Sequence, residues 1–207
     1  MKFPEAMSAK KTMLIGIDVC HAGPTSVVGF SASTNREMTQ YYSHYLVQKR
    51  GQEIVDSQLK ESLKLAVEAF QEKHNGDLPT NYVIFRDGVG DAQRDAVIRI
   101  EVSQFKEAIS QLYPEDSVAA SKPEVTLVVV NKRINQRFFM EDSNGRLNNP
   151  PSGCIIDRGL VEVGSDPDSE NKSFDFFITP ASANQGCVLA THCFVPLNES
   201  SLTKLEI

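Results

Sequence analysis

The chain has 207 residues, of which 41% are hydrophobic and 8% aromatic, and this is enough apolar material for one sizeable folded domain. Its 21 basic residues against 27 acidic ones give a net charge of −6, so the surface as a whole is not expected to attract nucleic acid nonspecifically. The absence of a CxxC pair, of a signal peptide and of any apolar run of roughly 18 residues predicts an intracellular protein with buried free cysteines, without zinc or a membrane partner.

The first half of the sequence predicts three strands and then a helix. Alternating and β-branched residues mark strands over 13–19, 26–33 and 38–48, and the short turns between them predict an antiparallel meander. Apolar residues then recur every three to five positions over 54–73, with charged residues between them. This spacing predicts an amphipathic helix.

The middle of the chain adds strands and helices in alternation. Strand 82–85 is followed by a short helix over 92–99 and by a helix that begins at Ser103, its expected N-cap. Residues 124–130 are almost all apolar or β-branched, which is typical of a strand covered on both faces in a parallel part of a sheet. The order of elements predicts an α/β fold, a ribonuclease-H-like mixed sheet in which the meander is followed by parallel strands, flanked by helices.

The last third is less regular. It contains short predicted strands at 154–157, 174–178 and 191–195. A polar and acidic loop over 164–171 separates the first two.

Two aspartates follow buried strands directly. Asp18 comes after the apolar run 13–17, and Asp87 follows strand 82–85 within the sequence Arg-Asp-Gly-Val-Gly-Asp. A carboxylate at a strand end, followed by glycines that open the backbone, can be presented to a metal ion or a phosphate. Two such strand ends suggest one shared site.

Several strings of residues together resemble the PIWI domain of Argonaute and Piwi proteins, and the Piwi clade in particular. They occur in the order expected of that family and cover roughly residues 11–197: Gly16-Ile17-Asp18-Val19, Arg50-Gly51-Gln52-Glu53, Tyr82 to Asp91, Val129 to Phe139, Phe174-Asp175-Phe176-Phe177 and Thr191-His192. Several motifs in the right order are far more specific than one motif alone. From the resemblance we expect a lead-in, 1–11, and a PIWI domain, 12–207, that is incomplete at its C-terminus.

The resemblance implies the catalytic core of a small-RNA-guided endonuclease that cuts target RNA in gene silencing. The family's catalytic set falls on Asp18, Glu53, Asp87 and His192, which would bind Mg²⁺, with Mn²⁺ as a substitute. Hard divalent cations prefer carboxylate oxygens, and a pair of them about 3.5–4 Å apart activates the attacking water and stabilises the leaving oxygen. Glu53 would complete the metal shell when its loop moves in.

A basic string follows strand 124–130 in this otherwise acidic protein. Lys132, Arg133 and Arg137 are expected to hold guide or target phosphates, and Asn135 and Gln136 to add hydrogen bonds to phosphate or sugar. A solvated strand end is the alternative interpretation. The expected partners are a guide RNA, a complementary target RNA and the remaining domains of a parent Piwi protein, in the cytoplasm or the nucleus.

Other interpretations stay open at this stage. Each proposed ligand has a structural alternative: Asp18 as a strand-end cap, Glu53 as an acid in the first turn of a helix, and His192 as a satisfied histidine on a half-buried strand. His21, His44 and His74 are interpreted as structural. The chain as a whole could instead bind RNA without cutting it, be a noncatalytic interaction fragment, or be another ribonuclease-H-like nuclease that acts on DNA. As an isolated fragment it is expected to be inactive.

Overall fold

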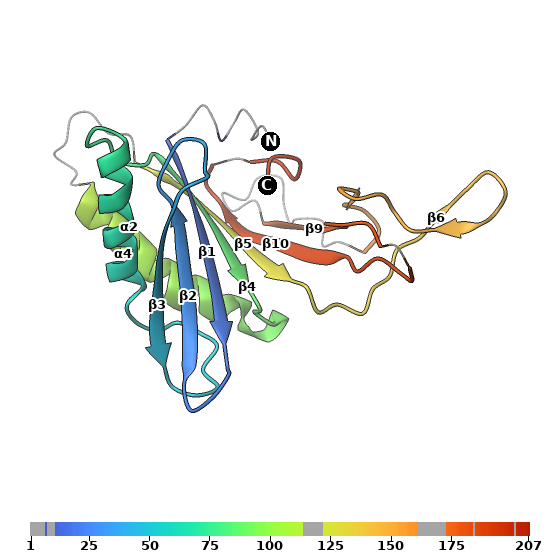
Figure 1. Cartoon of the computed structure of the whole chain (residues 1–207), viewed down its shortest axis with the longest axis horizontal. Coiled ribbons are helices and arrows are strands. Elements are labelled where there is room, and N and C mark those ends of the chain that lie inside the picture. The colour runs from blue at the N-terminus through green and yellow to red at the C-terminus, as the bar shows by residue number, and fades with distance from the viewer. Residues whose placement is uncertain (1–6, 8–10, 114–121, 161–172, 184, 201) are drawn as a thin grey trace.

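The computed structural model describes residues 7, 11–113, 122–160, 173–183, 185–200 and 202–207. Eight strands form one sheet in the order β3-β2-β1-β4-β5-β10-β9-β8, and β6 and β7 form a separate hairpin. Figure 1 shows α2 and α4 together on one side of the large sheet. The strands are β1 Thr12–Cys20, β2 Ser26–Ser33, β3 Tyr41–Gln48, β4 Asn81–Asp87, β5 Glu124–Asn131, β6 Met140–Glu141, β7 Leu147–Asn148, β8 Ile155–Ile156, β9 Phe174–Ile178 and β10 Thr191–Asn198. The helices are α2 Leu59–Lys73, α3 Arg94–Ala96 and α4 Ser103–Leu112, with a 3₁₀ turn at Asp91–Gln93 and a π-helical turn at Val97–Val102.

The predicted mixed sheet is confirmed. β1, β2 and β3 form the antiparallel meander, β4 runs parallel to both β1 and β5, and β10 returns antiparallel beside β5. Because β1, β4 and β5 run the same way and β10 runs the opposite way, the carboxyl ends of the first three and the start of β10 meet at one end of the sheet. The predicted site residues lie at this end of the sheet.

The main core lies between this sheet and the two longer helices. Met13, Ile15 and Ile17 alternate along β1 and pack in the same cluster as Leu63 of α2 and Phe105 of α4. The intervening residues of β1 face the other side of the sheet, as the two-residue period of a strand requires. There Leu14 packs against a second, smaller cluster. No helix in the described part of the chain is long and apolar enough to cross a membrane.

The helix boundaries differ from prediction in two places. The helix predicted over 54–73 begins only at Leu59, after Gln58, whose φ of 71° is left-handed. The predicted short helix and the one expected to begin at Ser103 join into a continuous helical stretch with a π-helical turn, so Ser103 is not an N-cap. Its hydroxyl donates instead to the carbonyl of Arg99. The predicted loop 164–171 lies outside the described residues.

The cysteines were expected to be buried, and for most of them this was wrong. Cys20 and Cys187 are exposed and Cys154 is half-buried, whereas Cys193 is buried on β10. Burial raises the pKa of the Cys193 thiol to about 11. None of the four is in a disulfide.

Candidate active site

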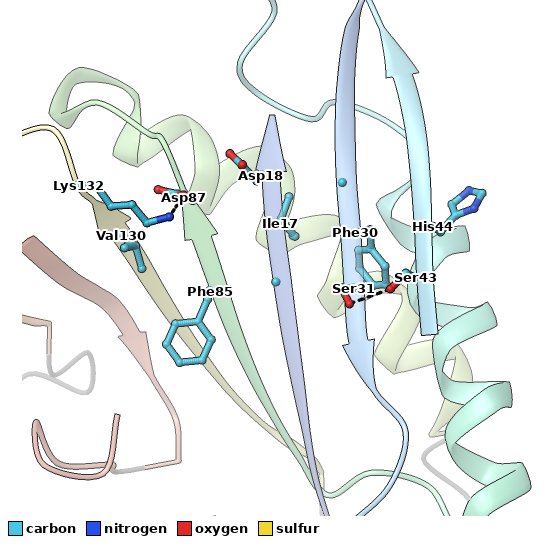
Figure 2. A pocket seen from close by; sticks show the side chains of 12 residues that line it. Ile17, Asp18, Phe30, Ser31, Ser43, His44, Phe85, Asp87, Val130 and Lys132 are labelled. Atoms are coloured by element: carbon cyan, nitrogen blue, oxygen red, sulfur yellow. Dashed lines mark hydrogen bonds and ion pairs between the residues drawn. The ribbon is translucent and has the colours of Figure 1, made fainter. Parts of the chain in front are cut away.

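Asp18 and Asp87 lie on neighbouring strands at the same end of the sheet. The parallel register pairs Ile17 with Arg86, the residues immediately before the two aspartates. Both side chains line a pocket on the sheet surface, and Figure 2 shows them at the strand ends with the side chain of Lys132 reaching toward Asp87. The predicted shared location of the two aspartates is therefore present.

A cation of the protein itself occupies part of this location. Lys132 directly follows β5, and its Nζ lies 2.5 Å from Oδ2 of Asp87. The hydrogen bond from Lys132 to Asp87 is the main reason that the pKa of Lys132 is raised, and the charge of Asp18 adds to the effect. The Lys132 side chain is nevertheless 65% exposed. The two carboxylates thus favour a positive charge beside them, and the ammonium that now provides it belongs to a largely exposed side chain.

Glu53 brings a third carboxylate to the same end of the sheet. It lies in the segment between β3 and α2, and only 14% of its side chain is exposed. Gly88, with a φ of +85°, lies between Glu53 and Asp18: a Cβ added there would be 3.7 Å from Oε1 of Glu53 and 3.9 Å from Oδ1 of Asp18. A Cβ at these distances would only touch the two carboxylates, so it is the left-handed backbone of Gly88 that favours glycine here.

Glu53 is held in this position by a buried arginine. Nη2 of Arg86 donates to the carboxylate of Glu53 at 2.9 Å and to its backbone carbonyl at 2.7 Å. Nε of Arg86 donates to Glu101 at 3.0 Å, and Arg86 is wholly buried. Burial raises the pKa of Glu101, whereas Arg86 and the backbone N–H of Val55 oppose that rise. The arginine therefore links the Glu53 segment to the helical stretch that contains Glu101.

A second contact reaches Glu53 from His21, the residue directly after β1. Nε2 of His21 lies 2.9 Å from Oε2 of Glu53, and Nδ1 of the same ring lies 2.8 Å from the hydroxyl of Ser26. The backbone N–H of Gly51 also donates to this hydroxyl, at 2.9 Å. If Nε2 donates to the carboxylate, Nδ1 accepts from Ser26. Each of these hydrogen bonds, from Gly51 through Ser26 and His21 to Glu53, then has one donor and one acceptor. His21, interpreted as structural from sequence, therefore belongs to the surroundings of Glu53.

His192 lies at the same end of the sheet but faces another partner. Its Nε2 is 2.7 Å from Oδ2 of Asp175, and its ring stacks on Phe177 with 4.5 Å between centroids. His192 pairs with Asn131 of β5, so one strand separates it from β4. At about 4.8 Å per strand, its backbone is roughly 10 Å from that of Asp87.

The four predicted ligands therefore do not form one coordination shell in this structure. Among the described residues, no three His, Cys, Asp or Glu side chains are close enough together to hold a metal ion. The donor set nevertheless fits a hard divalent cation in its chemistry, because Asp18, Glu53 and Asp87 supply carboxylate oxygens at one end of the sheet. The ion pair between Lys132 and Asp87 shows that a cation already lies beside these carboxylates.

The predicted RNA-binding residues form an exposed segment beyond β5. Arg133, Asn135, Gln136 and Arg137 are all exposed, as is Lys132. The guanidinium of Arg137 donates to the backbone carbonyls of Ile134 and Gln136, at 3.0 and 2.8 Å. The segment is therefore accessible to a ligand and begins beside Asp87.

Sequence reasoning missed the residues that support the proposed ligands. Arg86 carried a usable signal, because the period of a strand places it on the same face as Tyr82 and Ile84, where a charged side chain has to be paired. Glu101 and Asp175 carried no comparable signal. Glu101 contacts Arg86 and Asp175 contacts His192, and both pairs are distant in sequence and come together only in the folded chain.

Comparison with known proteins agrees with this architecture. The family model described as "Piwi domain" matches residues 1–207. Piwi-like protein 1 of Gallus gallus is 38% identical over 196 residues, which are 93% of this chain and 21% of that protein. The C-terminal lobe of a budding yeast Argonaute superposes with a TM-score of 0.79 at 26% identity, over 98% of this chain and 41% of the other. Kluyveromyces polysporus Argonaute, solved with a guide RNA, gives 0.78 at 26% identity, over 94% and 22%.

These similarities also confirm the predicted fold, because Argonaute PIWI domains are ribonuclease-H-like. The chain spans about a fifth of the length of the curated relatives it matches. The extent of the family match and the identity to Piwi-like proteins lead to one conclusion: the chain belongs to the Piwi domain family, the ribonuclease-H-like nuclease module of Argonaute and Piwi proteins.

Proposed function

We propose that this chain is the catalytic core of a small-RNA-guided endonuclease that cuts target RNA by two-metal-ion phosphodiester hydrolysis. The observation that carries the proposal is the placement of Asp18, Glu53 and Asp87 at one end of the sheet, with Asp18 and Asp87 lining the same pocket. The guide-bound Kluyveromyces polysporus Argonaute supports a guide RNA as partner. The target sequence would then be selected by base pairing with the guide, while the protein contacts the backbone.

Each residue has a separate role in this proposal. Asp18 and Asp87 would hold Mg²⁺, or Mn²⁺ in its place, and Glu53 and His192 would complete the ligand set. Bound divalent ions would supply a metal-activated water and stabilise charge on the leaving oxygen. Arg86 orients Glu53 through a direct hydrogen bond, so the third carboxylate does not depend on the metal for its position.

The basic segment after β5 would position the nucleic acid. Lys132 lies beside Asp87, and the exposed side chains of Arg133, Asn135, Gln136 and Arg137 continue away from the pocket. Arginine, lysine and amide side chains bind phosphate and sugar without distinguishing bases. This placement suits a strand whose scissile phosphate lies at the aspartates. We propose the cytoplasm or the nucleus as its location, because guide and target RNAs are found there.

The experiment compares guide-loaded protein in its longest encoded form with two matched variants. Asp87→Ala removes a proposed ligand, whereas Asp77→Ala removes a carboxylate that precedes β4 at the opposite end of the sheet and pairs with the exposed Lys11. An exposed pair of this kind contributes little to stability. We expect Mg²⁺-dependent cleavage of a guide-matched RNA by the wild type and Asp77→Ala, and none by Asp87→Ala. Equal cutting by all three would refute the assignment.

One observation favours a second function, guide and target binding without cleavage. His192 faces Asp175, and no metal-binding group of three side chains is present among the described residues. A binding module would retain RNA affinity in the wild type and in Asp87→Ala alike, with no Mg²⁺-dependent product from either. Cleavage by the wild type would exclude it.

A further inference from the structure

Asp175 is a buried carboxylate that contacts a proposed catalytic residue. It lies on β9, is 4% exposed, and its Oδ2 is 2.7 Å from Nε2 of His192 on the neighbouring strand β10. Its other oxygen, Oδ1, is buried and has no hydrogen-bond partner among the described residues. The pair is therefore a single contact between one carboxylate oxygen and one ring nitrogen.

This contact decides which ring nitrogen carries the proton. A neutral imidazole has one donor and one acceptor nitrogen, and an ionised carboxylate can only accept. The neutral ring of His192 paired with Asp175 therefore holds its hydrogen on Nε2 and its lone pair on Nδ1. Histidines that bind metals commonly donate their other N–H to a carboxylate in this way.

We propose that Asp175 is a positioning residue, which fixes the tautomer and orientation of His192 so that Nδ1 is its working atom. The inference rests on the proposed function in one respect: it assumes that His192 takes part in the reaction. It assigns a role to Asp175 and, within the ring of His192, to one nitrogen in place of the other.

Aromatic neighbours hold the ring in the same orientation. Phe177 stacks on His192 with the two planes 20° apart, and Phe138 packs on Phe177 with 5.1 Å between ring centroids. Rotation of the imidazole out of its plane would break the stacking. The carboxylate and the aromatic contacts therefore restrict the ring in complementary ways: one selects the nitrogen and the other the plane.

A purely structural role explains Asp175 poorly. A buried carboxylate loses its hydration, and one hydrogen bond compensates for only part of that loss when, as among the residues that the structure describes, the second oxygen has no partner. On its own face of the sheet, the next residue of β9, Phe177, and the cross-strand partner, Phe194, are apolar. An apolar residue would be the more stabilising choice here, unless the carboxylate serves His192.

The first test needs neither metal nor RNA. In the full chain labelled with ¹⁵N-histidine, long-range ¹H–¹⁵N spectra distinguish protonated from unprotonated ring nitrogens, and the His192→Gln variant identifies the His192 signals among those of the four histidines. We expect the wild type to have Nε2 protonated and Nδ1 unprotonated. Asp175→Asn, whose amide can either donate or accept, should give a mixture of tautomers or the opposite one.

The second test measures cleavage by the guide-loaded protein. An asparagine amide lies near the position of Nδ1 and a glutamine amide near that of Nε2, so His192→Asn should retain more activity than His192→Gln. Asp175→Asn should lower the cleavage rate by about 10- to 100-fold, as loss of an outer partner of a metal ligand typically does, with guide and target affinity unchanged. In a serine protease, the corresponding Asp-to-Asn change acts through the wrong tautomer.

The outcomes separate this inference from the proposed function. The role of Asp175 would be overturned if Nδ1 is protonated in the wild type. It would also be overturned if Asp175→Asn leaves the spectrum and the cleavage rate unchanged, even where Asp87→Ala abolishes cleavage. His192→Gln cutting better than His192→Asn would overturn the assignment of Nδ1. If Asp87→Ala cuts like the wild type, the proposed function fails, and the spectra still decide the tautomer.

Discussion

Replacing Arg86 with methionine should destabilise the protein strongly and release Glu53. Arg86 is wholly buried, and its guanidinium contacts Glu101, the carboxylate and carbonyl of Glu53, and the carbonyl of Asp87. Removal of one member of a buried ion pair costs about 3–5 kcal/mol, because the remaining charge is left uncompensated. Glu101, 2% exposed, would take up a proton and so reduce the cost toward the lower figure.

The expected effect is large enough to measure by urea unfolding. With a urea slope of about 2 kcal/mol/M, a loss of about 3–5 kcal/mol lowers the unfolding midpoint by roughly 1.5–2.5 M. Arg86→Lys keeps the charge but loses the forked donors, so it should recover only part of the loss. A midpoint lowered by less than about 0.5 M in Arg86→Met would refute the view that this arginine supports the buried charge.

A double variant separates stability from the position of Glu53. Arg86→Met combined with Glu101→Leu removes both buried charges, and such replacements are often neutral or stabilising. The backbone N–H of Val55, which donates to Glu101 at 2.9 Å, would lose its acceptor at a cost of about 1–3 kcal/mol. We expect the double variant to unfold at a higher urea concentration than Arg86→Met and still to cut poorly, because Glu53 remains unsupported. Full recovery of cleavage would show that Arg86 acts through stability alone.

Three further changes test neighbouring groups. Lys132→Met should tighten Mn²⁺ binding to RNA-free protein, measured by calorimetry, because the ammonium that competes for Asp87 is gone; weaker binding would show that the two do not compete. Burial raises the pKa of Glu101 above 4.5, so the native state holds the carboxyl proton more tightly than the unfolded chain does. Protonated Glu101 therefore adds to the unfolding free energy below pH 4.5, and this contribution is lost as pH rises through the pKa of the folded state. Urea unfolding across pH should show that loss in the wild type and not in Glu101→Gln, and parallel pH profiles would contradict it. Ser26→Ala should cost about 0.5–1.5 kcal/mol in urea unfolding, because the N–H of the exposed Gly51 loses a hydrogen bond; an unchanged midpoint would show that water replaces the hydroxyl.

Most of the strands followed from local pattern, whereas the start of α2 did not. Strand periodicity and the β-branched run at Glu124–Asn131 are local properties, so β1, β2, β4 and β5 were predicted with small errors. The residues before Leu59 carry apolar spacing that suits a helix. They are held out of it by contacts distant in sequence: Val55 donates to Glu101, and the carbonyl of Glu53 accepts from Arg86.

The candidate site divides in the same way. Asp18 and Asp87 could be placed together from sequence, because the ends of parallel strands meet at one edge of a sheet. The orientation of His192 could not, since it depends on Asp175, 17 positions away on a neighbouring strand. The same holds for His21, whose contact with Glu53 spans 32 positions and follows from the path of the loop before α2.

The partners of the proposed ligands indicate which part of the site has to change when a metal binds. Glu53 is paired with Arg86, which is buried and tied to Glu101, so this contact is expected to persist. Asp87 is paired with Lys132, whose side chain is 65% exposed. An exposed ion pair contributes at most about 1 kcal/mol, far less than divalent-ion coordination by several carboxylates, so a metal would displace Lys132 and leave Arg86 in place. The displaced ammonium of Lys132 would then be available to a phosphate beside the metal. Binding of the ion would in this way precede the contact of Lys132 with the RNA.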